Sequence, residues 1–123
     1  MKTALVTGST SGLGLELCKT LLEKEYKVYG ISRQVENPLL SYIDNYSHIK
    51  CDLSSINSEI QISKHLNDKI DLVINNAAIY IKKKFRDTDL NEISKILDLN
   101  IKGTLHVTKI VLPFLKDSSS IIF

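Results

Sequence analysis

The chain has 123 residues, the length of a single domain, and its 43% hydrophobic and 24% charged residues are ordinary for a globular protein. A net charge of +2 is too small to indicate nucleic acid or a membrane surface as a partner. No apolar run approaches the roughly 18 residues of a membrane span, and no signal peptide precedes the first strand pattern. Two cysteines make no disulfide framework, so we expect a cytoplasmic protein with free thiols.

The first pattern along the chain is an apolar strand, Ala4–Val6, that runs into a glycine-rich turn and then a helix ending near Lys24. The glycines have the spacing G-x-x-x-G-x-G over residues 8–14. Glycine lets the backbone turn tightly and approach a ligand closely. The unpaired N–H groups and the dipole of a helix start favour a phosphate. We therefore predict a phosphate over Gly12–Gly14, the alternative being an ordinary turn between a strand and a helix.

The rest of the chain alternates between strand and helix patterns. We expect further strands at Tyr26–Ile31, His48–Asp52, Ile70–Ile74 and Ile121–Phe123. We expect helices at 12–24, weakly at 39–46, from Ser54 or Ser55 to about Asn67, and from about Asn91 to Leu115, with loops at 79–86 and 118–120. The alternation predicts one domain over residues 1–123, an α/β fold of Rossmann type. Its doubly wound parallel sheet has the order 3-2-1-4-5 and helices on both faces. Ligands bind such sheets where the strand order reverses, which is beside the glycine turn.

Five motifs, in order along essentially the whole chain, resemble the N-terminal part of a classical short-chain dehydrogenase/reductase. They are TGSTSGLG at 7–14, Asp52-Leu53, NNAA at 75–78, Asn100 within LDLNIKG, and LPFL at 112–115. Only the last alanine of NNAA departs, standing where the family usually has glycine. The resemblance implies an oxidoreductase that interconverts a small-molecule carbonyl and an alcohol with a nicotinamide cofactor.

The family resemblance also implies roles for single residues. Asn100 would hold a water of the catalytic proton relay, and the helix that carries it often forms the family's dimer contact, so we expect a homo-oligomer. No spacing of histidine with cysteine indicates a metal. The residues implied around the cofactor are Gly8, Ser11, Gly12, Leu13 and Gly14 at the pyrophosphate and adjoining ribose, Asp52 and Leu53 at the adenine, and Asn75 and Ala77 at the ribose and nicotinamide side.

The end of the second expected strand bears on the choice of cofactor. NAD-binding members usually place an acidic residue there, on the ribose 2′-hydroxyl. This chain has Ser32 and Arg33 instead. A guanidinium suits a 2′-phosphate, and Ser32 would add a donor. We therefore expect NADP(H) rather than NAD(H), the alternative being that Arg33 is a solvated surface charge.

The family's reaction also needs a serine and a Tyr-x-x-x-Lys pair beyond the fifth strand. A literal Tyr-x-x-x-Lys stands at Tyr46–Lys50, which precedes Asp52. It lies in an extended segment, where residues four apart are roughly 13 Å from each other. We interpret Tyr46 as a partly buried aromatic and Lys50 as a solvated charge. The serines at 118–120 precede the fifth strand and are expected to form a loop.

The apolar residues Ile121–Phe123 would leave a central strand of the full fold as an open edge. We therefore expect a sheet that is incomplete at the C-terminus, as in a truncated form of a longer protein, and self-association or partners at that edge. The chain alone is expected to have no turnover. The alternative is a non-catalytic nucleotide-binding or interaction protein that keeps half of the fold.

Overall fold

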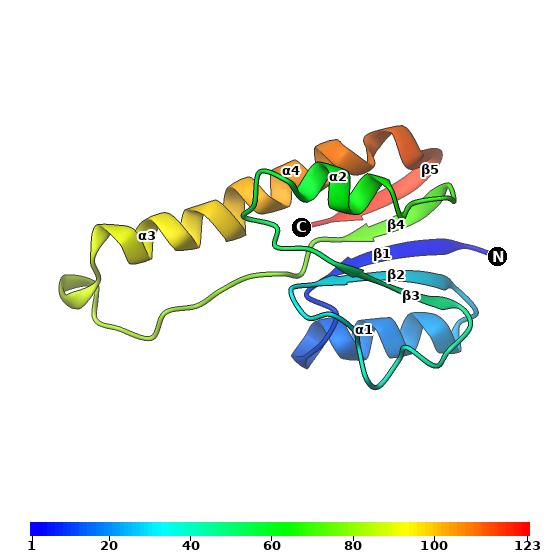
Figure 1. Cartoon of the computed structure of the whole chain (residues 1–123), viewed down its shortest axis with the longest axis horizontal. Coiled ribbons are helices and arrows are strands. Elements are labelled where there is room, and N and C mark those ends of the chain that lie inside the picture. The colour runs from blue at the N-terminus through cyan, green and yellow to red at the C-terminus, as the bar shows by residue number, and fades with distance from the viewer.

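The computed structural model describes residues 1–123, and its centre is a sheet of five parallel strands. The strands are β1 (Thr3–Thr7), β2 (Lys27–Ser32), β3 (Tyr46–Lys50), β4 (Ile70–Ile74) and β5 (Leu115–Ile122). Their order across the sheet is β3-β2-β1-β4-β5, as Figure 1 shows. The predicted doubly wound order is confirmed. The strand order reverses between β1 and β4, so the carboxyl end of β1 lies at the position where such sheets bind ligands.

Helices cover both faces of the sheet. Helix α1 (Gly12–Glu23) lies on one face, and α2 (Ser58–Ser63) and α4 (Thr104–Val111) lie on the other (Figure 1). Helix α3 (Leu90–Leu97) extends away from the sheet and continues into α4 through a π-helical turn, η2 (Asp98–Gly103). Short 3₁₀ turns, η1 (Phe85–Asp87) and η3 (Leu112–Phe114), flank this long helix. None of the helices is long and apolar enough to cross a membrane.

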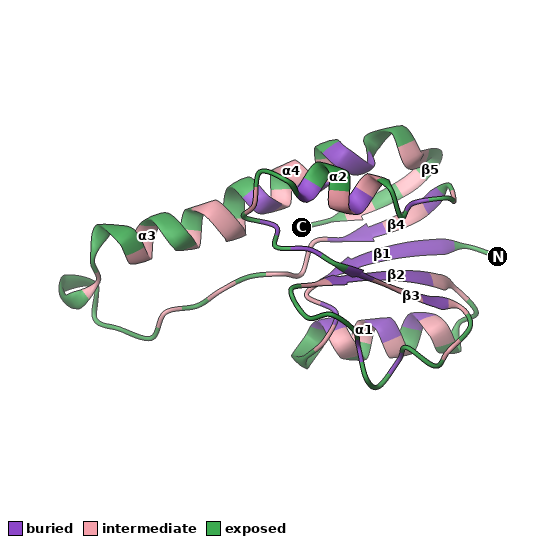
Figure 2. Cartoon of the chain, in the orientation of Figure 1, coloured by how far each residue is buried: buried purple, intermediate pink, exposed green.

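Strand β1 is buried along its whole length because both of its faces and both of its edges are covered, and Figure 2 shows it as the buried centre of the molecule. Its side chains alternate between two cores. Ala4 and Val6 pack with Cys18 on the α1 side, whereas Leu5 packs with Ile62 and Val107 on the side of α2 and α4. A nearly continuous apolar run is what a parallel strand between two helical layers requires.

Two segments do not form the helices predicted for them, because their side chains make hydrogen bonds to nearby backbone groups. One segment forms no helix, and the other forms a shorter one. Residues 39–45 form turns rather than a helix, and Tyr46 begins β3. The side-chain oxygen of Asn37 accepts the Leu39 N–H at 3.2 Å, and the Ser41 hydroxyl donates to the Asn37 carbonyl at 2.6 Å. Likewise, Asp52 accepts the Ser54 N–H at 3.0 Å, and α2 starts only at Ser58 and ends at Ser63. Such turns offer the backbone partners that compete with a helix.

The predicted limits of the third and fifth strands, and of the long helix, also need correction. Strand β3 begins at Tyr46, two residues earlier than predicted, and ends at Lys50 instead of Asp52. Strand β5 begins at Leu115, so the predicted loop at 118–120 is wrong and the helix before it ends at Val111. The register shifts within β5, because Ile70 is opposite Leu115 whereas Leu72 is opposite Ser120. An irregularity of this kind takes extra residues into a strand without ending it.

Both cysteine thiols are buried against the sheet, and burial raises the pKa of Cys18 to about 12 and that of Cys51 to about 11. Because the thiolate is the reactive form, we expect neither thiol to react with iodoacetamide at about pH 8 in the folded chain. Both should react in urea, as measured by mass spectrometry. Rapid alkylation of Cys18 in the native protein would contradict this packing.

Candidate functional site

In the turn after β1, the backbone geometry or the packing requires glycine at each of positions 8, 12 and 14. Gly8 and Gly12 adopt positive φ angles of 69° and 53°, which residues with a side chain rarely adopt. A β-carbon on Gly14 would overlap the carbonyl oxygen of Gly8. The first turn of α1 therefore packs directly on the end of β1, backbone against backbone.

The start of α1 is open to a ligand. Ser11 is the N-cap residue of the helix, but its side chain makes no capping hydrogen bond. The backbone N–H groups of Gly12, Leu13 and Gly14 have no acceptor within the chain. Three free donors at the positive end of a helix dipole form a site for an anion. This geometry fits the diphosphate of a dinucleotide at the predicted position.

Thr7 and Asn76 join the end of β1 to the end of β4. The buried Thr7 hydroxyl oxygen accepts the backbone N–H of Asn76 at 3.0 Å and that of Ala77 at 2.9 Å. The Asn76 side-chain amide donates to the Thr7 carbonyl at 3.0 Å and to the Gly8 carbonyl at 3.4 Å. Neither residue was predicted to have a role, although each stands inside a motif. Their hydrogen bonds close the floor of the site between the two strands.

A cleft of about 290 Å³ opens at the carboxyl ends of β1, β2 and β4. Many of the residues predicted to surround a cofactor line this single cleft: Gly8, Ser11, Ser32, Arg33, Asp52, Leu53 and Ala77. The lining also includes Thr10, Gln34, Ile79 and Leu99, which sequence reasoning missed. The predicted residues Gly12, Leu13 and Gly14 lie beside the cleft at the start of α1 and do not line it.

Asn75 and Asn100 line a neighbouring hollow of about 320 Å³, which shares Ala77 with the cleft. The Asn75 amide nitrogen donates to the Thr108 hydroxyl at 3.3 Å. Its side-chain oxygen is buried and has no hydrogen-bond partner within the chain. A buried acceptor without a partner is costly unless a further group binds it, which fits a ligand lying along this hollow.

Asn100 lies in the π-helical turn and holds the chain that follows β4. Its side-chain oxygen accepts the Ile79 N–H at 2.8 Å, and its amide donates to the Ile79 carbonyl at 3.0 Å. A π turn inside an α-helix is frequent at functional sites. The Asn100 side chain therefore fixes one wall of the cleft, because Ile79 lines it.

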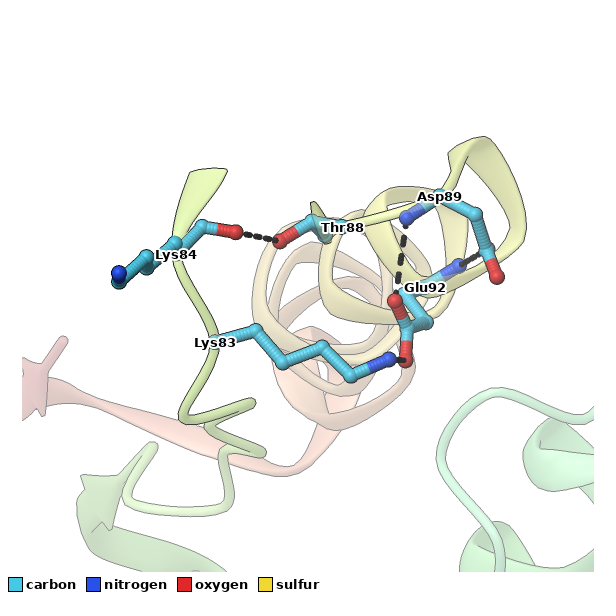
Figure 3. A network of polar contacts seen from close by, with 5 residues as sticks. All are labelled: Lys83, Lys84, Thr88, Asp89 and Glu92. Carbon is cyan, nitrogen blue, oxygen red and sulfur yellow. Dashed lines mark hydrogen bonds and ion pairs between the residues drawn. The ribbon is translucent and has the colours of Figure 1, made fainter. Parts of the chain in front are cut away.

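Figure 3 shows a polar network at the far end of the same segment. Asp89 caps α3 by accepting the Glu92 N–H at 2.9 Å, and Glu92 accepts the Asp89 N–H at 3.1 Å. Glu92 also forms an ion pair with Lys83 at 2.6 Å, which lowers the pKa of Glu92 and raises that of Lys83. Together with the Asn100–Ile79 pair, the network ties the chain after β4 to the long helix at two points.

Three charged side chains lie around the end of β2. Arg33 is exposed and lines both the cleft and an adjoining hollow of about 280 Å³, which Lys50 and Asp52 also line. Neither Arg33 nor Lys50 forms an ion pair. Hydrogen bonds from Ser54, helped by the charge of Arg33, hold the pKa of Asp52 below its usual range. This corner therefore offers two cations without ion-pair partners beside one ionised carboxylate.

A glycine turn, an open helix start and a cleft at the switch point of a parallel sheet define a dinucleotide-binding domain of Rossmann type. The family model for short chain dehydrogenases matches residues 2–123. The chain belongs to the short chain dehydrogenase family, as its motifs predicted. Members of this family are oxidoreductases that bind NAD or NADP and act on small molecules.

Curated and solved relatives agree with this assignment. "Probable NADP-dependent dehydrogenase" of Haemophilus influenzae is 34% identical over 118 residues, 90% of this chain and 47% of the relative. An uncharacterized oxidoreductase of Schizosaccharomyces pombe is 31% identical over 127 residues, 98% of this chain and 51% of the relative. The crystal structure of a short chain dehydrogenase family protein from Francisella tularensis is 31% identical with a TM-score of 0.86, covering 98% of this chain and 49% of that one. The chain thus spans about half the length of the curated relatives it matches.

The contact between Gly14 and Gly8 predicts an unequal cost for alanine in the turn. Gly14→Ala must displace the end of β1, so we expect it to lower the free energy of unfolding by about 3 kcal/mol, at the upper end of overpacking costs. Gly12→Ala is the matched control, because a β-carbon there meets nothing within 4 Å and costs only the positive φ, about 1–2 kcal/mol. Urea unfolding measures both. A larger loss for Gly12→Ala would contradict the packing described here.

Proposed function

We propose that the chain binds NADP(H) in the cleft and serves as the cofactor-binding part of an oxidoreductase that interconverts a carbonyl and an alcohol. The observation that carries this proposal is the pairing of an open helix start with a strand β2 that ends in Ser32 and Arg33. The first suits a diphosphate, and the second suits a 2′-phosphate where NAD-binding proteins place an acidic residue. The printed name of the Haemophilus influenzae relative, an NADP-dependent dehydrogenase, supports the same choice.

Each part of the cofactor has candidate partners along the site. The pyrophosphate would lie on the free N–H groups of Gly12–Gly14 with the Ser11 hydroxyl beside it. The adenine would lie between the Arg33 corner and Asp52–Leu53. The ribose and nicotinamide side would reach Ala77 and the unpartnered oxygen of Asn75. A bound nicotinamide supplies or accepts the hydride.

Asn100 is the one candidate in this chain for the proton relay. Its side chain uses one lone pair and one N–H on Ile79, so a second lone pair and a second N–H stay available to a water. The hollow that Asn100 lines adjoins the cleft through Ala77. We propose that Asn100 holds a water there while it fixes the segment after β4.

A second candidate function is a nucleotide-binding or interaction protein without turnover. The observation that favours it is that neither Tyr-x-x-x-Lys of the chain lies on a helix. Tyr46–Lys50 runs along the extended strand β3, and Tyr80–Lys84 lies in the irregular segment after β4. The Tyr46 hydroxyl is buried in a network with Ser9, Asn37 and His48, so it is not available as a catalytic acid. We therefore propose that this chain alone binds cofactor without turning over substrate. Carbonyl-dependent oxidation of NADPH by the purified chain would refute this.

We also propose a cytoplasmic homo-oligomer. The long helix formed by α3, η2 and α4 is largely exposed, as the colouring of Figure 2 shows, and four of its exposed side chains are apolar. They are Leu90, Leu97, Ile101 and Leu105. An exposed apolar stripe of this kind is typical of an association surface. Sedimentation of the purified chain measures the oligomeric state, and a monomer at all concentrations would count against this proposal.

The cofactor proposal predicts that Arg33 controls the preference for NADPH. We expect the chain to bind NADPH more tightly than NADH, and Arg33→Ala to weaken NADPH about 10- to 100-fold, the worth of one charge-assisted hydrogen bond. Binding of NADH should change less than about twofold, because NADH carries no 2′-phosphate.

Fluorescence titration measures these affinities, and Lys82→Ala, an exposed cation outside the cleft, is the control. Equal affinity of the unmodified chain for NADPH and NADH would contradict the proposed preference. So would an Arg33→Ala variant that keeps it.

A further inference from the structure

His48 links the interior of the sheet to the corner where β2 ends. It lies on β3, opposite Gly30. Its Nδ1 is 3.1 Å from the Tyr46 hydroxyl. Its Nε2 is 3.0 Å from the carbonyl oxygen of Gln34 and 3.3 Å from the hydroxyl oxygen of Ser32. The ring therefore contacts the same turn that carries Arg33.

The hydrogen-bond partners assign the proton of the neutral ring. A carbonyl oxygen only accepts, so the contact with Gln34 requires a proton on Nε2. Nδ1 is then the acceptor and receives a hydrogen bond from the Tyr46 hydroxyl. The opposite tautomer would place a lone pair of Nε2 against the Gln34 oxygen at 3.0 Å.

This assignment determines what the Ser32 hydroxyl can do. Its oxygen accepts the backbone N–H of Gln34 at 3.1 Å and shares the Nε2–H of His48 at 3.3 Å. A hydroxyl has two lone pairs and one proton, so both lone pairs are in use. Only the proton of Ser32 remains, and Ser32 lines the cleft. Ser32 therefore faces a ligand as a donor and not as an acceptor.

The two side chains at the end of β2 discriminate between the two cofactors. Ser32 and Arg33 both offer donors, and a phosphate offers only acceptors at this point. The 2′-hydroxyl of NAD carries a proton of its own, which finds no acceptor on either side chain. An unpaired polar group in a binding site costs affinity.

We propose that His48 is a specificity-determining positioning residue, which turns the Ser32 hydroxyl into a dedicated donor for a 2′-phosphate. This inference rests on the proposed function, since it concerns the same cleft, and it adds a residue from β3 that need not touch the cofactor.

Hydrogen bonds that begin in the glycine turn also fix the position of His48. Tyr46 accepts a hydrogen bond from the Asn37 amide at 3.3 Å, and its hydroxyl also lies 3.3 Å from that of Ser9. A β-carbon on Gly30 would overlap the Tyr46 hydroxyl, so glycine at that position makes room for the network. A chain of polar contacts thus runs from Ser9 through Tyr46 and His48 to Ser32.

The test compares adenosine 2′,5′-bisphosphate with adenosine 5′-diphosphate by calorimetry on the full chain. We expect His48→Leu to weaken the 2′-phosphate ligand about tenfold, as for one oriented hydrogen bond, and the diphosphate less than about twofold. His48→Gln should keep affinity for the bisphosphate within about threefold, because its amide nitrogen can replace Nε2 as a donor.

A double-mutant cycle separates positioning from a general loss of structure. Ser32→Ala should weaken the bisphosphate to a similar extent, and adding His48→Leu to it should bring no further loss, because the two residues act through one hydroxyl. Additive losses would overturn the inference. A His48→Leu variant that keeps the full preference for the 2′-phosphate would overturn it as well, while leaving the proposed function intact.

A spectroscopic measurement needs no variant. Nitrogen-15 NMR of the imidazole ring should show the neutral tautomer with its proton on Nε2. A proton on Nδ1 would overturn the inference even if the substituted chains fail to fold. An unmodified chain that binds both nucleotides equally would instead overturn the proposed cofactor preference, and the inference with it.

Discussion

Two pieces of backbone, the first turn of α1 and the carboxyl end of β1, pack directly against each other. No side chain fits between Gly14 and Gly8, and the Asn76 amide occupies the space that a β-carbon on either residue would need. The contact sets the direction in which α1 leaves the sheet. It thereby points the free N–H groups of the helix start at the cleft, so the geometry of the anion site follows from an absence of side chains.

The site is assembled from segments that the doubly wound order brings to one edge of the sheet. The glycine turn follows β1, Ser32 and Arg33 end β2, Asp52 follows β3 and Ala77 follows β4. Each of these segments contributes only one or a few residues to the site. Hydrogen bonds of Thr7 with Asn76, and of Asn100 with Ile79, join the ends of β1 and β4 and the long helix into one side of the rim of the cleft. The rim has the features of the short chain dehydrogenase family, to which the chain belongs.

The sequence predicted what depends on local pattern and missed what depends on contacts between distant residues. The strand order and the start of α1 followed from alternation and from glycine spacing, and both are confirmed. The turns after Asn37 and Asp52 were mistaken for helix because a single side chain accepting a backbone N–H outweighs weak apolar periodicity. The roles of Asn76 and His48 depend on partners in other strands, which no spacing in the sequence reveals. The assignment of residues to parts of the cofactor stays a prediction.

We propose that one cleft, bounded by the glycine turn and the end of β2, holds the whole adenosine half of NADP. Amide chemical-shift mapping during titration with NADP⁺ tests this claim most directly, since every backbone N–H in the site reports separately. We predict the largest shifts at Gly12–Gly14, at Ser32–Gln34 and at Asp52–Leu53, with little change along α3. Shifts confined to the exposed face of the long helix, or none at Ser32–Gln34, would contradict the account.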